Sequence, residues 1–230
     1  MMKAAIILAR GGSIGLPKKN ILTFCGKPLI SWTIQHCLKS GIEDVYVSSD
    51  CNKILSISSE YGAIGIKRPI ELSGPEATSE SAWIHALEYL EKNNLFPELI
   101  IAPQVTSPIR HDNDIRKGLD EFVNNGYDSL FSASLAEDLF LWHQKQGVLE
   151  GINHNWNNRQ RRQDFPCQLI ENGSFYIFKS DLLRTHGNRL GGKIGFNLME
   201  KWKMFEIDDI EDFELCEILM KKYILEKICE

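Results

Sequence analysis

Short apolar runs of strand length alternate along most of the chain with stretches in which apolar residues recur at helical spacing. The strand-like runs lie at residues 4–9, 44–50, 63–66, 99–102 and 128–134, and the helical patterns at 28–41, 52–61, 78–90, 112–123 and 213–223. Such alternation is typical of a parallel sheet that is covered by helices on both faces. The pattern therefore predicts an α/β protein with a three-layer, mostly parallel, Rossmann-like sheet.

The alternation breaks at residues 137–162, which contain Trp142, Trp156 and the basic run Arg159-Gln160-Arg161-Arg162. Because aromatic residues and arginine are enriched at protein interfaces, we predict a dimerisation arm at about 137–170. A solvated basic face is the alternative. After the arm, a turn and strand are predicted at 171–178, with further strands at 193–199 and 203–207.

The composition limits the classes of protein that need consideration. Of the 230 residues, 43% are hydrophobic and 25% are charged, which favours one domain over residues 1–230 that includes the arm. The net charge of −5 disfavours a nucleic-acid-binding surface. No apolar run is long enough to cross a membrane, and the apolar start is interpreted as a strand. Six scattered cysteines without a C-x-x-C pair favour reduced thiols in a cytoplasmic enzyme.

A loop rich in glycine and positive charge follows the first strand. Gly11, Gly12 and Gly15 allow a tight turn and a close approach to main-chain N–H groups. The nearby side chains of Arg10, Ser13, Lys18 and Lys19 complete a loop that suits an anion with several charges, such as a triphosphate. The loop matches neither the P-loop nor the dinucleotide-binding fingerprint. An ordinary strand-to-helix turn with surface lysines is the alternative.

Several polar residues have a structural interpretation as helix caps. Asp50 ends the second strand near an edge where ligands gather, but we favour it as the cap of the helix at 52–61. Asp112 is predicted to cap the helix that carries residues 115–123. Thr78 begins a stretch with capping-box chemistry, and the acidic residues 209–212 are interpreted as the cap of the last helix.

Glu206 is not explained by the last helix, because it precedes that helix. Glu206 and Asp208 are two residues apart in a segment predicted to be extended, so their side chains would share one face. Two carboxylates on one face suit a hard cation such as Mg²⁺.

Five stretches in order resemble the acylneuraminate cytidylyltransferases, also called CMP-sialic acid synthetases. They are Leu8-Ala9-Arg10-Gly11-Gly12-Ser13 with Pro17-Lys18-Lys19-Asn20, Gln104-Val105-Thr106-Ser107-Pro108, Arg161-Arg162-Gln163-Asp164, Glu171-Asn172-Gly173-Ser174-Phe175-Tyr176 and Glu206-Ile207-Asp208. The resemblance covers essentially the whole chain. It implies a nucleotidyltransferase sheet and transfer of CMP from CTP to the anomeric hydroxyl of a nine-carbon 2-keto sugar acid, with release of pyrophosphate, whereas the homodimer is predicted from the arm alone.

The resemblance also implies roles for individual residues. Arg10 and Lys19 would hold the triphosphate together with Gly11, Gly12 and Ser13, and Arg10, Lys19 and Asp208 would form the catalytic set. Asn20, Arg68 and Ser81 would face the cytidine. Gln104, Arg162 and Tyr176 would line the sugar pocket, and Glu206 and Asp208 would bind Mg²⁺.

Three positions depart from the family pattern. Ile14 replaces a usual lysine and removes one phosphate contact, Val105 replaces a proline of many bacterial members, and Glu206 replaces a usual aspartate. These departures leave two alternatives open. One is a transferase that uses another nucleotide or a related sugar such as legionaminate, and the other is a catalytically weak, nucleotide-binding regulatory protein.

Overall fold

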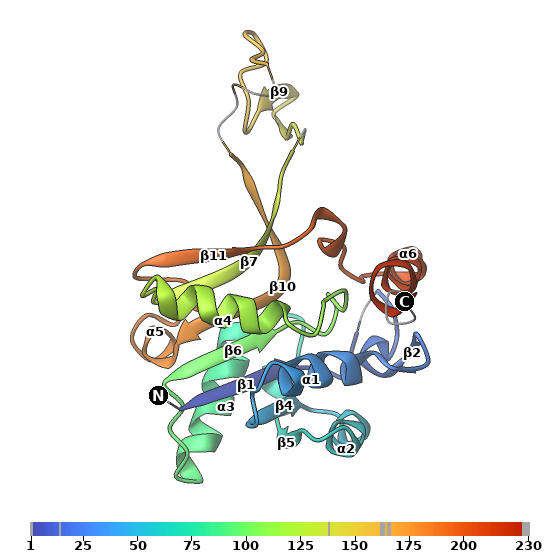
Figure 1. Cartoon of the computed structure of the whole chain (residues 1–230), viewed down its shortest axis with the longest axis vertical. Helices are drawn as coiled ribbons and strands as arrows, with labels where there is room; N and C mark the ends of the chain where they lie inside the picture. The colour runs from blue at the N-terminus through green and yellow to red at the C-terminus, as the bar shows by residue number, and fades with distance from the viewer. Residues whose placement is uncertain (1, 14, 138, 162–163, 165–166, 227–230) are drawn as a thin grey trace.

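A computed structural model describes residues 2–13, 15–137, 139–161, 164 and 167–226. Its centre is a seven-stranded sheet with the order β11-β7-β10-β6-β1-β4-β5 (Figure 1). The strands are β1 (Lys3–Leu8), β4 (Val45–Ser49), β5 (Ile64–Lys67), β6 (Leu99–Pro103), β7 (Ser129–Leu135), β10 (Leu169–Lys179) and β11 (Ile194–Leu198). Neighbouring strands run parallel except β10, which is antiparallel to β6 and β7. The predicted α/β class and mostly parallel sheet are confirmed.

Helices cover both faces of this sheet (Figure 1). They are α1 (Leu29–Lys39), α2 (Asn52–Glu60), α3 (Ser79–Lys92), α4 (Asp114–Asn124), α5 (Ser180–His186) and α6 (Ile210–Met220). Short 3₁₀ turns are η1 (Lys19–Ile21), η2 (Ile70–Leu72) and η4 (Lys201–Lys203), and a π-helical turn, η5 (Lys221–Leu225), follows α6.

The unbroken apolar run of β1 serves two hydrophobic cores at once. Ala5 and Ile7 pack in the core that also contains side chains of α1, α2, α4 and α6. Ala4 and Ile6 point to the other face and pack with α3 and α5. Because successive side chains of a strand point to opposite faces, a central strand of a three-layer protein must be apolar throughout.

The prediction of a strand at 203–207 is wrong. Residues 201–203 form η4, and residues 204–207 have no regular secondary structure. The buried ammonium of Lys203 lies 2.7 Å from Asp114 Oδ2 and 2.7 Å from Glu200 Oε2. These ion pairs hold the segment in place without a strand ladder. The structure also contains a small hairpin of β2 (Thr23–Phe24) and β3 (Lys27–Pro28), and the short helix α5 was not predicted.

Two cap predictions are confirmed and two are wrong. Asp209 and Asp212 form a capping box at the start of α6, and Thr78 Oγ1 accepts from the Ser81 N–H at the start of α3. Asp112 instead pairs with Lys39 Nζ at 2.9 Å, and the N-cap of α4 is Asn113. Asp50 does not cap α2, whose N-cap residue is Cys51.

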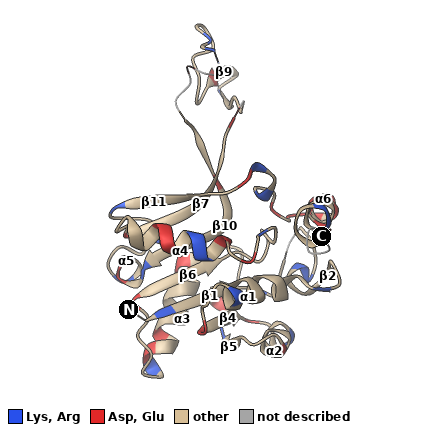
Figure 2. Ribbon diagram, in the orientation of Figure 1, with Lys and Arg blue, Asp and Glu red and all other residues tan. Residues whose placement is uncertain are grey.

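The predicted excursion leaves the sheet between β7 and β10 and projects well away from the body (Figure 1). It carries a two-stranded hairpin of β8 (Trp142–Lys145) and β9 (Val148–Gly151). Its large apolar side chains are exposed: Phe140, Leu141, Trp142, Val148, Leu149, Ile152 and Trp156. Charged residues of both signs occur on the arm and over the body (Figure 2). The predicted role in dimerisation stays a prediction.

Among the described residues, no helix combines the length and the apolar content that crossing a membrane requires.

Candidate active site

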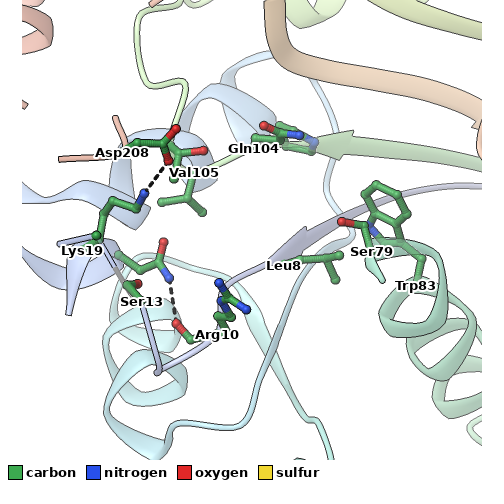
Figure 3. A pocket seen from close by; sticks show the side chains of 13 residues that line it. Leu8, Arg10, Ser13, Lys19, Ser79, Trp83, Gln104, Val105 and Asp208 are labelled. Carbon is green, nitrogen blue, oxygen red and sulfur yellow. Dashed lines mark hydrogen bonds and ion pairs between the residues drawn. The ribbon is translucent and has the colours of Figure 1, made fainter. Parts of the chain in front are cut away.

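A cleft with a volume of about 440 Å³ opens at the carboxyl ends of β1 and β6 (Figure 3). β1 and β6 are neighbours near the middle of the sheet. The chain adds β4 next to β1 on one side and β10 next to β6 on the other. Open α/β sheets bind ligands at such a point. The cleft is lined by Leu8, Arg10, Ser13, Gly15, Lys19, Asn20, Ser79, Trp83, Pro103, Gln104, Val105, Thr106 and Asp208.

The glycine-rich loop is held in place by side chains from neighbouring elements. The Gly11 N–H donates to Asp50 Oδ1 at 2.8 Å, which is the role that Asp50 takes in place of capping α2. The Asn20 side-chain amide donates to the Arg10 carbonyl at 2.9 Å. A Cβ at Gly15 would lie 2.4 Å from the Asp208 carbonyl oxygen, so only glycine allows the loop to pass this close to the segment before α6.

Lys19 and Asp208 form the charged end of the cleft. Lys19 Nζ donates to the Ile207 carbonyl at 2.5 Å and lies 3.1 Å from Asp208 Oδ1. The Lys19 side chain is 11% exposed, whereas that of Asp208 is 79% exposed. A buried stem therefore fixes the lysine, and the carboxylate stays accessible to a ligand from the cleft.

Two further cations lie near the loop: Arg10, which lines the cleft, and Arg68. Arg10 Nη1 approaches the Gly74 carbonyl at 3.4 Å, and Arg68 Nε donates to Ser73 Oγ at 2.9 Å. Burial lowers the pKa of Arg68, and the nearby Asp50 carboxylate opposes that shift. Arg68 is buried and is not among the residues that line the cleft within the described part of the chain.

The turn after β6 is clamped by the fully buried Arg110. Its Nη1 donates to the Ser174 carbonyl at 2.6 Å, and both terminal nitrogens lie 3.2 Å from the Gln104 carbonyl. Nη2 also donates to Thr33 Oγ1 at 2.7 Å. Burial lowers the pKa of Arg110 to about 10. Among the described residues no carboxylate lies within ion-pair distance of this guanidinium, and its hydrogen-bond acceptors are backbone carbonyls and uncharged side-chain atoms.

Glu206 contacts the same turn. Thr106 Oγ1 donates to Glu206 Oε1 at 2.5 Å. When the Gln104 amide is oriented so that donors face acceptors, its nitrogen lies 3.2 Å from Glu206 Oε1 and 3.2 Å from the Gly173 carbonyl.

The start of α3 forms the opposite wall of the cleft (Figure 3). Ser79 and Trp83 are four residues apart and therefore share one face of the helix. The sequence interpretation missed both and selected Ser81, whose hydroxyl donates to the Thr78 carbonyl at 2.8 Å. The i, i+4 spacing of a serine and a tryptophan in the first turns was the signal that could have identified them.

The structure brings about half of the predicted site residues together at one cleft. Arg10, Ser13, Lys19, Asn20, Gln104 and Asp208 line it. Gly11, Gly12, Arg68, Ser81, Tyr176 and Glu206 lie outside the lining within the described residues. Arg162 and Ile14 fall outside the described residues.

Tyr176 lies in a polar cluster of its own. Its hydroxyl donates to Glu171 Oε1, and the Arg189 guanidinium carbon lies 4.4 Å from the ring centroid. Burial, followed by the bond to Glu171, raises the pKa of Tyr176, and the Glu206 charge adds to the rise. This cluster is another feature that the sequence interpretation missed, since it selected Tyr176 but not Arg189.

The donor chemistry at the charged end fits Mg²⁺. The Asp208 carboxylate is an accessible hard oxygen donor. Among the described residues, no group of three or more His, Cys, Asp or Glu side chains is placed to hold a metal. Mg²⁺ is commonly bound by one or two carboxylates, waters and substrate phosphates, so a sparse protein donor set agrees with a metal that enters with a nucleotide.

Residues 4–228 match the family model described as "Cytidylyltransferase", so the chain belongs to the cytidylyltransferase family. It is 34% identical to N-acylneuraminate cytidylyltransferase A of Danio rerio over 93% of this chain and 50% of that protein. It is 28% identical to pseudaminic acid cytidylyltransferase of Campylobacter jejuni over 96% of this chain and 97% of that protein. The chain spans only about half the length of the N-acylneuraminate cytidylyltransferases that it matches.

A solved structure shares the fold. A CMP:2-keto-3-deoxy-manno-octonic acid synthetase complexed with CTP superposes with a TM-score of 0.71 at 16% identity, covering 97% of this chain and 100% of that one. The expected family and Rossmann-like fold are confirmed by these comparisons.

Proposed function

We propose that this protein transfers CMP from CTP to the anomeric hydroxyl of a sialic-acid-like nonulosonate and releases pyrophosphate. The observation that carries the proposal is a single cleft that joins cationic loop residues, the accessible Asp208 and the clamped Gln104. The similarity to N-acylneuraminate and pseudaminic acid cytidylyltransferases supports this substrate class.

The reaction needs charge neutralisation and in-line positioning more than covalent help from the protein. Arg10 and Lys19 would neutralise the triphosphate, while Gln104 would orient the sugar so that its hydroxyl oxygen attacks the α-phosphorus. The new oxygen–phosphorus bond forms as the bond from the α-phosphorus to the oxygen bridging to the β-phosphate breaks, pyrophosphate leaves, and the hydroxyl proton passes to water. Mg²⁺, held by Asp208 with Glu206 as the second predicted ligand, would stabilise negative charge and lower the pKa of a coordinated hydroxyl.

Pyrophosphate release tests this proposal. The four nucleoside triphosphates are each combined with N-acetylneuraminate, legionaminate and pseudaminate in the presence of Mg²⁺. We expect release with CTP and at least one of these sugars, with little release for the other nucleotides. Release with another nucleotide would favour the alternative transferase.

A catalytically weak regulatory protein is the second candidate, motivated by Ile14 in place of the family's usual lysine. It predicts CTP binding without pyrophosphate release for any sugar in the panel. Titration calorimetry with CTP, run beside the release assay, separates binding from turnover.

We further propose that the arm at about 137–170 joins two copies of the chain in a cytoplasmic homodimer. The exposed Trp142 and Trp156, which pack against one another with ring centroids 6.4 Å apart, support an interface on the arm. The five cysteines among the described residues are all unpaired, which supports a reducing compartment. Light scattering at micromolar concentration tests the dimer, and Trp142→Ser with Trp156→Ser is expected to give monomers. A monomeric parent protein with full activity would contradict this proposal.

A further inference from the structure

We propose that Glu206 is a positioning residue for the acceptor sugar, acting through Gln104 and Thr106, and that Asp208 alone of this pair serves the metal and the nucleotide. The inference rests on the cytidylyl transfer proposed above and deepens it. It differs from the expectation that both carboxylates bind Mg²⁺.

The hydrogen bonds of Glu206 run toward the turn after β6. Its Oε1 accepts from Thr106 Oγ1 at 2.5 Å and from the Gln104 amide nitrogen at 3.2 Å. The same amide nitrogen donates to the Gly173 carbonyl at 3.2 Å. The Gln104 amide cannot rotate without losing both acceptors, so Glu206 fixes the orientation of a side chain that lines the cleft.

The two carboxylates are separated by a buried anchor. Ile207 lies between them in the chain, packs fully buried in the core, and donates its N–H to the Thr106 carbonyl at 2.8 Å. From that anchor, Asp208 reaches Lys19 Nζ, whereas Glu206 reaches Thr106. Asp208 is exposed and lines the cleft, while Glu206 is half-buried behind the turn.

Gly173 packs close to Glu206 on its other side. Gly173 has φ +67, and a Cβ there would lie 3.0 Å from the end of the Gln104 amide and 3.4 Å from Glu206 Oε2. The ring of Tyr176, on the same strand, carries a hydroxyl whose pKa is raised in part by the Glu206 charge. Glu206 therefore lies near Gln104 and Tyr176, the two described residues that the family resemblance assigns to the sugar pocket.

Two conservative substitutions of Glu206 separate a positioning role from a metal-binding role, because one removes the charge and the other shortens the side chain. Glu206→Gln removes the charge but keeps the length and an oxygen that accepts from Thr106. Glu206→Asp keeps the charge but is one methylene too short to maintain both hydrogen bonds. A metal ligand tolerates aspartate better than glutamine, whereas a positioning residue tolerates glutamine better than aspartate.

The experiment measures metal and sugar separately. Mn²⁺ serves as the probe, and its affinity for the protein is measured by electron paramagnetic resonance with CTP and without sugar. The Michaelis constants for sugar and for CTP are then measured by pyrophosphate release with Mg²⁺. Asp208→Asn is the matched control for loss of a metal ligand, and melting temperatures verify that each variant is folded.

We expect Mn²⁺ affinity to fall at least tenfold in Asp208→Asn and to stay within about twofold of the parent in Glu206→Gln. We expect Glu206→Asp to raise the Michaelis constant for the sugar by about tenfold, with a smaller rise in Glu206→Gln and an unchanged constant for CTP. Mn²⁺ binding weakened as much by Glu206→Gln as by Asp208→Asn would overturn the inference, as would sugar constants unchanged in both Glu206 variants. If the parent protein transfers CMP to no sugar, the proposed function fails, and the Mn²⁺ measurement still decides the assignment of Glu206.

Discussion

The two ends of the cleft hold their charged groups in opposite ways. At the Lys19 end, the Asp208 carboxylate is 79% exposed and is bonded to one neighbouring ammonium. At the Gln104 end, the Arg110 guanidinium is fully buried and donates to backbone carbonyls of two separate segments. Asp208 can exchange its bond to Lys19 for a bond to a ligand at a small cost in free energy. Arg110 cannot leave its carbonyl partners without a large cost, because they are buried with it. We infer that the Lys19 end binds a charged ligand, whereas the Gln104 end keeps the turn after β6 in one conformation.

The most direct way to break this comparison is Asp208→Ala. Because the side chain is exposed and bonded only through Lys19, its loss should leave the fold intact while turnover falls by roughly two orders of magnitude or more through loss of the metal ligand. Pyrophosphate release gives the turnover, and the melting temperature reports the fold. Near-normal turnover at ordinary Mg²⁺ would remove Asp208 from the catalytic set.

Arg110→Met should act mainly on the stability of the fold, in contrast to Asp208→Ala. The change leaves the Gln104 carbonyl without the Arg110 donor and leaves the buried Ser174 carbonyl with only the Gln104 N–H, at a cost of about 1–3 kcal/mol. A melting temperature lower by roughly 5–10 °C follows for a chain of this size. Calorimetry measures the shift. Arg110→Lys serves as the control, because it keeps the charge but cannot reach both carbonyls as a fork. An unchanged melting temperature in Arg110→Met would mean that the clamp does not stabilise the turn.

Ile14→Lys tests whether the charged end has room for one more cation. A charge-assisted hydrogen bond to the triphosphate contributes about 1.5–3 kcal/mol, which corresponds to a CTP Michaelis constant lower by roughly tenfold. Steady-state kinetics at varied CTP measures the constant, with Ile14→Met as the uncharged control. An unchanged or raised constant would show that position 14 is not a vacant phosphate contact.

The smallest predicted effect is on the pH dependence of stability, through His36 beside the buried Arg110. His36 is fully enclosed, and its pKa is held well below 6.5 by burial and by the nearby charge of Arg110. The unfolded chain therefore binds a proton below about pH 6.5 that the folded protein does not, so this part of the stability is present at neutral pH and is lost as pH falls. In His36→Gln the decrease in unfolding free energy between pH 7.0 and pH 5.5 should be smaller by about 1 kcal/mol. Urea unfolding at both pH values measures it, and an unchanged decrease would contradict a neutral His36.

The sequence alone determined the class of fold and the chemistry of the loop. Unbroken apolar strands such as β1 and helical spacing such as that of α3 are consequences of burial, which acts on each element separately and therefore leaves a pattern in the chain. The N-cap at Thr78 and the capping box at Asp209 were predictable for the same reason, since their partners lie three residues away. The resemblance to the cytidylyltransferases added the candidate site, of which Arg10, Lys19, Gln104 and Asp208 meet at the cleft.

Only the tertiary structure decided which partners distant residues would take. Asp50 holds Gly11 across 39 positions, Lys19 reaches Asp208 across 189, and Thr106 reaches Glu206 across 100. The failed strand at 203–207 has the same cause, because the buried Lys203 pairs with Asp114 across 89 positions. Short polar side chains bond whatever donor the fold brings within 3 Å or so, and neither propensity nor spacing encodes that choice. The different roles proposed for Glu206 and Asp208 follow from such contacts. Their two-residue spacing in the sequence does not predict this difference.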